Sequence, residues 1–201
     1  MRMVKLALTS TLIFLLMSVV YLKTPSYYKY EISDWFGRLF APSFDTLLDD
    51  LKVRDQTEII SEYKNLGYKL KCYGNLRPNE KIGESDDYLC WALISSAFDG
   101  VPARLVTFFF SKNRLHHVRL EFPESSLARI QTHLSQSPVN LDSLPKFDFG
   151  VDDKGIPLKV WKVKRGLVTT SDSTSFKGHA IVLWTSTQSI LERVLSKRTK
   201  P

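Results

Sequence analysis

Two segments of the chain are apolar at nearly every position, without the spacing that marks a single helix face. Residues 105–110 read LVTFFF and residues 180–184 read AIVLW. Neighbouring side chains of a strand point to opposite faces, so a strand with this pattern needs apolar cover on both sides. The pattern therefore predicts that these two segments form the centre of a sheet.

Other stretches alternate between apolar and polar residues and are predicted as strands. Residues 68–74 form one of them. Residues 114–122 follow the first apolar segment after the turn sequence SKNR, so the two together predict a hairpin. Residues 158–165 and 167–172 predict a second hairpin around a glycine.

Helical spacing of apolar residues predicts helices in two stretches of the N-terminal half. Residues 43–67 contain one bent helix or two short ones, with Ser43 as the N-cap and Gly67 at the C-terminal cap. Residues 88–99 predict a short helix, because their apolar side chains can share one helix face and a glycine follows them.

Two more helices are predicted, over residues 124–136 and after residue 186. The whole pattern favours an α+β fold with a mainly antiparallel sheet, built from hairpins and flanked by helices. Over about residues 103–185, the order of hairpin, helix and hairpin is similar to that of the small envelope-assembly lipoproteins of bacteria. The similarity is one of element order, without a shared motif, and it implies a role in envelope assembly.

The N-terminal segment has the pattern of a membrane anchor. Residues 6–22 carry no charge, Arg2 and Lys5 precede them, and Lys23 follows. Seventeen residues at a rise of about 1.5 Å each extend roughly 25 Å, the short end of a bilayer-spanning helix. Residues 1–23 are therefore predicted as an uncleaved signal anchor. A cleaved secretory signal and a buried N-terminal helix are the alternatives, although no Ala-x-Ala cleavage site is present.

This interpretation sets the domain organisation and the compartment. Residues 24–42 are predicted as a juxtamembrane linker and residues 43–201 as an extracytoplasmic α+β domain. The protein is then a single-pass protein of the cytoplasmic (inner) membrane, with its C-terminal domain in the periplasm. Membrane lipid is the partner of the N-terminal helix, and nucleic acid is not expected as a partner.

The chain has only two cysteines, Cys72 and Cys90, and they bracket a polar loop. In an oxidising compartment such a pair is expected to form a disulfide, whereas two separately buried thiols are the alternative. The bond would close a loop of about 19 residues and stabilise the fold by about 3 kcal/mol. The spacing matches neither a zinc motif nor a Cys-x-x-Cys redox motif.

Composition and charge add one candidate surface. The hydrophobic fraction of 43% and the charged fraction of 24% are typical of a globular protein. The net charge of +7 lies in the last quarter, because residues 154–201 hold ten basic and two acidic side chains. A cationic hairpin there could contact anionic lipid, contact an acidic protein or form a solvated sheet edge. Its predicted surface consists of Lys159, Trp161, Lys162, Lys164 and Arg165.

Residues able to perform catalysis are present, but no arrangement of them is diagnostic. His116 and His117 are neighbours in a predicted strand, so one is expected to point inward and the other to the surface. Asp86 and Asp87 precede the predicted helix at residues 88–99, where capping and the helix dipole explain them. No nucleophile motif is found. No catalytic residue, metal site or cofactor is therefore predicted.

Two classes of function remain for such a chain. The first is a membrane-anchored, disulfide-stabilised binding or envelope-assembly protein that acts through protein–protein contacts. The second is an extracytoplasmic hydrolase of an envelope polymer, with His133 or His179 as the base and one of the aspartate pairs assisting. An inhibitor or immunity-type protein is a third hypothesis. A pocket that gathers a histidine and an aspartate would favour the enzyme, and a flat exposed apolar surface would favour the binding protein.

Overall fold

The computed structural model describes residues 35–136, 154–175 and 178–191. The chain divides into two units, Met1–Leu39 and Phe40–Pro201. Of the first unit only a short helix at residues 35–39 is described, so the predicted anchor at residues 1–23 lies outside the described residues. Within the described ranges, no helix is both long and apolar enough to cross a membrane.

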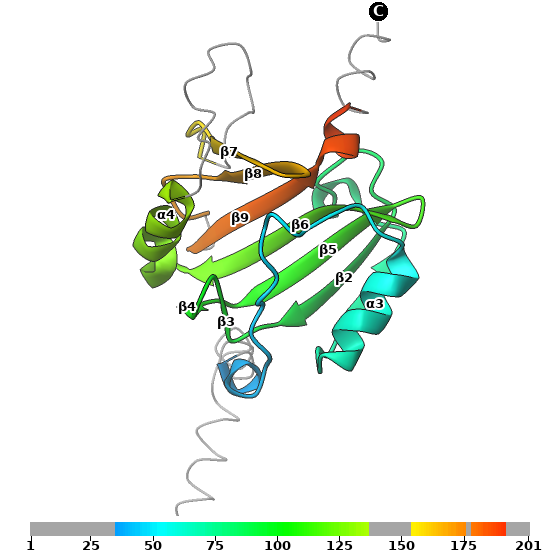
Figure 1. Ribbon diagram of the computed structural model, residues 1–201, viewed down its shortest axis with the longest axis horizontal. Helices are drawn as coiled ribbons and strands as arrows, with labels where there is room; N and C mark the ends of the chain where they lie inside the picture. The colour runs from blue at the N-terminus through cyan, green and yellow to red at the C-terminus, as the bar shows by residue number, and fades with distance from the viewer. Residues whose placement is uncertain (1–34, 137–153, 176–177, 192–201) are drawn as a thin grey trace, which may run out of the picture. The chain divides into compact units, whose positions relative to one another are not determined.

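The second unit is built on one antiparallel sheet of seven strands in the order β1-β2-β5-β6-β9-β8-β7 (Figure 1). This confirms the α+β class and the mainly antiparallel sheet. A small second sheet pairs β3 (Ser96–Ala97) with β4 (Val101–Pro102). The strands of the large sheet are β1 (Lys71–Gly74), β2 (Tyr88–Leu93), β5 (Leu105–Ser111), β6 (Arg114–Pro123), β7 (Lys159–Val163), β8 (Gly166–Thr170) and β9 (His179–Ser186).

The two segments that are apolar at nearly every position lie at the centre of this sheet, as predicted. Strand β6 is the middle strand, and β5 and β9 pair with its two edges. Phe108 on β5 and Trp184 on β9 are completely buried. The two predicted hairpins, β5–β6 and β7–β8, are also present. The register of β7 with β8 is regular, so β7 has no bulge, and its apolar side chains point to both faces of the sheet.

The prediction of a helix at residues 88–99 is wrong. Residues 88–93 form β2, which pairs with β1 on one side and β5 on the other. The apolar residues that could share one helix face instead supply both faces of a covered strand. Because a short apolar run fits either structure, the tertiary pairing decides.

The helices α3 (Gln56–Asn65) and α4 (Leu127–Ser135) lie at opposite ends of the sheet (Figure 1), and residues 187–191 are helical, as predicted for the segment after residue 186. Residues 43–54 are not helical, and the N-cap of α3 is Asp55 instead of Ser43. Gly67 ends α3 as predicted. It adopts a φ of 87°, and the N–H groups of Gly67 and Tyr68 donate to the carbonyls of Lys64 and Tyr63.

The two faces of the large sheet have different surroundings. On the first, here called the core face, a row of facing residues crosses all seven strands: Cys72, Cys90, Phe108, Val118, Trp184, Val168 and Trp161. Both helices contribute to the cluster formed here, and Tyr63 of α3 lies 4.5 Å from Phe108 between ring centroids. The other side, here called the second face, carries the row Tyr73, Leu89, Phe109, His117, Thr185 and Leu167.

Candidate functional site

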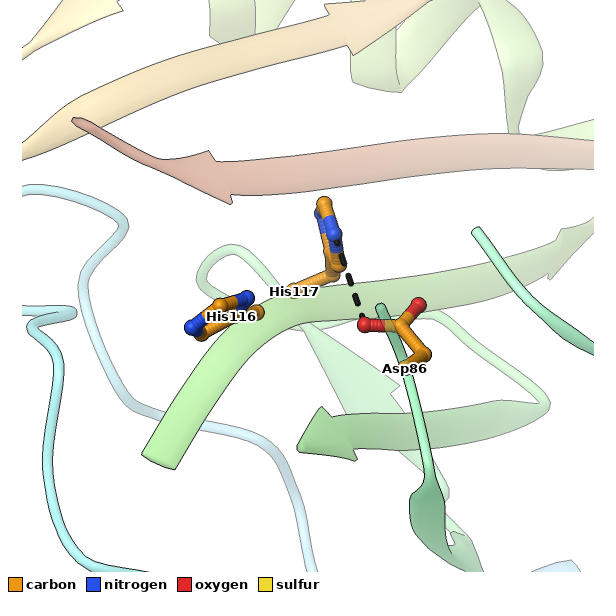
Figure 2. A group of neighbouring side chains, drawn as sticks. All are labelled: Asp86, His116 and His117. Atoms are coloured by element: carbon orange, nitrogen blue, oxygen red, sulfur yellow. Dashed lines mark ion pairs between the residues drawn. The ribbon is translucent and has the colours of Figure 1, made fainter. Parts of the chain in front are cut away.

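A cluster of buried polar side chains lies on the second face, where the loop of residues 75–87 meets β6. Asp86 is 0% exposed, His116 2% and His117 4%. The prediction that one histidine points inward and the other to the surface is therefore wrong. Figure 2 shows the two imidazoles leaving adjacent positions of β6 while the carboxylate comes from the loop.

A β-bulge in β6 explains why both histidines are buried. Phe109 faces His117 and Phe110 faces Leu115, so His116 has no partner on β5. Leu115 and Val118 both join the core cluster although they are three residues apart. Strict alternation would separate them, and the extra residue of a bulge restores the pattern. The sequence carried this signal in the odd spacing of Leu115 and Val118.

The loop, and not a helix, positions Asp86. Its Oδ2 accepts hydrogen bonds from the backbone N–H groups of Ile82 at 3.0 Å and Gly83 at 2.7 Å. The expected capping role of Asp86 and Asp87 is wrong, because a strand follows them. Asp87 instead accepts a hydrogen bond from the N–H of Lys112, in the β5–β6 turn, at 3.0 Å.

The His117 ring is held from three sides. Its Nδ1 lies 3.2 Å from Thr185 Oγ1, its Nε2 lies 3.1 Å from Ser189 Oγ, and the same Nε2 lies 3.7 Å from Asp86 Oδ1 (Figure 2). The serine and the aspartate therefore approach one nitrogen. In a Ser-His-Asp relay they must contact opposite nitrogens, so this arrangement does not form one.

Two atoms of the cluster lack a hydrogen bond within the described part of the chain, Asp86 Oδ1 and His116 Nδ1. Burial raises the pKa of Asp86, while the two backbone N–H donors act in the opposite direction. Asp86, His116 and His117 each offer one donor atom, and these atoms all lie within 4.8 Å of one another. The cluster is thus a set of three potential metal ligands.

The predicted disulfide between Cys72 and Cys90 is present. The two cysteines face each other on the paired strands β1 and β2, so the bond ties an edge strand to its neighbour. The intervening loop is the one that carries Asp86. Both ends of this loop are thus attached to the sheet.

The cationic hairpin is only partly on the surface. Lys162, Lys164 and Arg165 are exposed, and Lys159 pairs with Asp172 at 2.7 Å. Trp161 is 3% exposed and belongs to the core cluster, so it lies inside and not among the surface cations.

The two other histidines are placed apart from each other. His133 stacks on Phe98, with 4.8 Å between ring centroids, beside a cavity of about 250 Å³ that Asp45, Asp49 and Asp99 also line. Most of the other lining residues are apolar, and no ion pair between His133 and a carboxylate is found in the described ranges. Nε2 of His179 lies 3.0 Å from a guanidinium nitrogen of Arg104, and Nδ1 of His179 lies 3.7 Å from a carboxylate oxygen of Glu121.

Beyond the loop, the second face remains partly exposed. A patch of partly exposed residues, here called the second-face patch, extends over β2, β5, β6 and β9 and consists of Trp91, Leu93, Leu105, Arg119, Ile181 and Leu183. The register places Leu93 beside Leu105, and Arg119 beside Leu183. Arg119 forms an ion pair with Glu121, and the Lys71 ammonium lies 4.8 Å from the centre of the Trp91 ring.

Comparison of the chain with protein-family models, with curated proteins and with solved structures finds no match. The functional argument therefore depends on the geometry of the chain itself.

Proposed function

We propose that this protein is a single-pass membrane-anchored binding protein whose disulfide-stabilised domain lies outside the cytoplasm. It binds a protein partner on the second-face patch, in the manner of an envelope-assembly factor. The observation that carries the proposal is the patch itself, an apolar and cationic area on an antiparallel sheet. Antiparallel sheets commonly leave one face to solvent, and an apolar area on such a face is typical of an interaction surface.

The chemistry of the patch suggests the chemistry of the partner. Arg119, Arg104 and Lys71 bring three positive charges, and Glu121 brings one negative charge. Apolar side chains lie on both sides of these charges. A protein segment with apolar side chains around an acidic one would match this pattern, and its charge would speed the encounter more than it tightens the complex.

The disulfide supports the compartment. Such bonds persist in oxidising compartments and are rare in the cytosol. The described helix at residues 35–39, which begins thirteen residues after the uncharged run, exposes Trp35, Phe36 and Leu39. Aromatic side chains at that position suit a membrane–water interface, so they support an anchor formed by residues 6–22.

The hydrolase alternative finds less support in the geometry. His133 lies beside a cavity that three aspartates also line, but its ring stacks on Phe98, and His179 lies between Arg104 and Glu121. A general base must reach the proton that it removes while a nucleophile or acid faces it. His133 forms no ion pair with a carboxylate within the described ranges, and the carboxylate beside His179, that of Glu121, is already paired with Arg104 and Arg119.

Site-specific photo-crosslinking tests the binding surface. A photoreactive residue at position 183, in the patch, is expected to give one adduct of defined mass in intact cells that make the full-length chain. The same residue at position 66, an exposed leucine at the end of α3, serves as the control. Arg119→Glu should remove the adduct at position 183. Equal adducts at both positions, or none at position 183, would contradict the proposal.

Fractionation tests the compartment separately. The full-length chain is expected to stay in the membrane pellet after an alkaline wash, and protease added outside the inner membrane should degrade its domain. Recovery of the full-length chain in the soluble fraction, or an N-terminus beginning near Tyr27, would contradict the anchor.

A further inference from the structure

The fold described so far gives no reason for burying the polar side chains of Asp86, His116 and His117 together. Buried polar groups are normally hydrogen-bonded, and leaving one without a partner is unfavourable. Here two such atoms, Asp86 Oδ1 and His116 Nδ1, lie in one cluster, together with Nε2 of His117. We propose that the three residues bind a divalent transition-metal ion, which fixes the loop of residues 75–87 to the second face of the sheet.

The distances favour this assignment. Donor atoms of a tetrahedral zinc site, each about 2.0–2.1 Å from the ion, lie about 3.3 Å from one another. His117 Nε2 and Asp86 Oδ1 are 3.7 Å apart, close to that separation. The remaining pairs of donor atoms lie within 4.8 Å, so the donors must move closer together when the ion binds. The bulge is what supplies two imidazoles from adjacent residues of one strand.

The surroundings orient the ligands as an outer shell does. The two N–H donors occupy Oδ2 of Asp86, so Oδ1 is left to face the histidines. Thr185 Oγ1 lies beside Nδ1 of His117, which favours the tautomer with a lone pair on Nε2. A Cβ at Gly83 would lie 3.0 Å from that Nε2, so glycine lets the loop approach closely.

Ligand chemistry and burial define the class of ion. Two imidazoles and one carboxylate suit Zn²⁺ and its first-row neighbours better than calcium or magnesium, which prefer oxygen ligands. All three residues are at most 4% exposed, and the Ser189 hydroxyl, 3.1 Å from Nε2 of His117, would have to give up this contact when that nitrogen binds the ion. A closed site of this kind is structural, so the ion contributes to the stability of the fold.

Metal titration of the full-length chain in detergent, after treatment with a chelator, tests the site. One equivalent of Zn²⁺ is expected to bind and to raise the midpoint of thermal unfolding, and Co²⁺ should give visible absorption bands of a four-coordinate site. Asp86→Asn keeps an oxygen that can accept the two N–H bonds, so it should fold and yet lose at least tenfold in affinity. Thr185→Val removes the hydroxyl beside Nδ1 of His117 and no ligand, and it should lower the affinity for Zn²⁺ about 10–100-fold.

Controls separate this site from adventitious binding by histidine. His133→Ala and His179→Ala, outside the cluster, should keep the affinity and the midpoint shift of the wild type. If the wild type binds no Zn²⁺ and no Co²⁺, or if Asp86→Asn binds as tightly as the wild type, the proposal is wrong. Photo-crosslinking at position 183 does not depend on this outcome, because the second-face patch contains none of the three ligands.

Discussion

Phe108 and Phe109 are neighbours on β5, and their rings enter different environments on opposite faces of one sheet. Phe108 belongs to a cluster that includes α3 and α4 and the middle of the sheet. Phe109 belongs to a small cluster with Leu76 and Leu89, under the loop that carries Asp86. The core face thus uses apolar packing over its whole width, whereas the second face relies on a short loop and buried polar groups, and the disulfide that ties the two ends of this loop lies on the core face.

The largest expected effect comes from truncating the two neighbouring rings. Phe108→Ala is expected to lower the free energy of unfolding by about 3–5 kcal/mol, because it leaves a cavity among well-packed side chains. Phe109→Ala should cost at least about 1 kcal/mol less, since the loop above it can settle into the space. Urea denaturation of both variants measures the difference, and equal losses would mean that the two faces are packed alike.

Removing the disulfide should have the next largest effect. Cys72→Ala with Cys90→Ala is expected to lower the free energy of unfolding by about 3 kcal/mol, because the closed loop spans a sequence separation of 18 residues. Peptide mapping without reduction should recover the linked pair from the wild type. Two freely alkylated thiols in the native protein would refute the bond.

Two glycines test the space on each face. At Gly166, on the core face, a Cβ would lie 2.3 Å from the Thr185 carbonyl oxygen and 2.9 Å from Nε1 of Trp184, so Gly166→Ala should cost about 1–3 kcal/mol. At Gly83 a Cβ would lie 3.0 Å from the ring nitrogen of His117, a milder overlap than the one with backbone at Gly166, so Gly83→Ala should cost less than Gly166→Ala, about 1 kcal/mol. Thermal unfolding compares them, and a larger loss at Gly83 would reverse the expected order.

The smallest effect on stability is expected at the cationic hairpin. Reversing the charges of Lys159, Lys162, Lys164 and Arg165 should change the free energy of unfolding by no more than about 0.5 kcal/mol, apart from the loss of the Lys159–Asp172 pair. The same variant should lose binding to vesicles of anionic lipid at low salt, where each cation contributes about 1 kcal/mol. Both the wild type and the variant are tested in a form that lacks residues 1–34, so that the N-terminal segment does not bind the vesicles. If the wild-type protein in this form binds no such vesicles, the hairpin is a solvated sheet edge.

The sequence predicts the core face better than the second face. Residues 105–110 and 180–184 are recognisable as central strands because apolar residues at every position demand cover on both sides. The same rule leaves residues 88–93 ambiguous, since a short apolar run also fits a helix, and only pairing with β1 and β5 decides between them. Local capping patterns predicted the end of α3 at Gly67 but not its start at Asp55.

The buried cluster could not be predicted from the rule used for strands. That rule sends His116 and His117 to opposite faces, and the bulge cancels it. Asp86 is distant from them in sequence, and its position depends on a loop that packs on the sheet. The spacing of Leu115 and Val118 was the available sign of the bulge, but nothing local indicates that the loop would bring Asp86 beside the two histidines.

The strand order has a consequence for the way the chain is made. Among the strands that the structure describes, β9 comes last in sequence and lies between β6 and β8, so it joins a four-strand meander to the β7–β8 hairpin. Until it arrives, both halves present an unpaired edge, and such edges are sites of wrong pairing and aggregation. Thr185 and Ser189, which hold His117, are supplied by this last segment. Folding therefore cannot finish until residues 179–189 are available, and a chain truncated before residue 179 should be a target for chaperones and proteases.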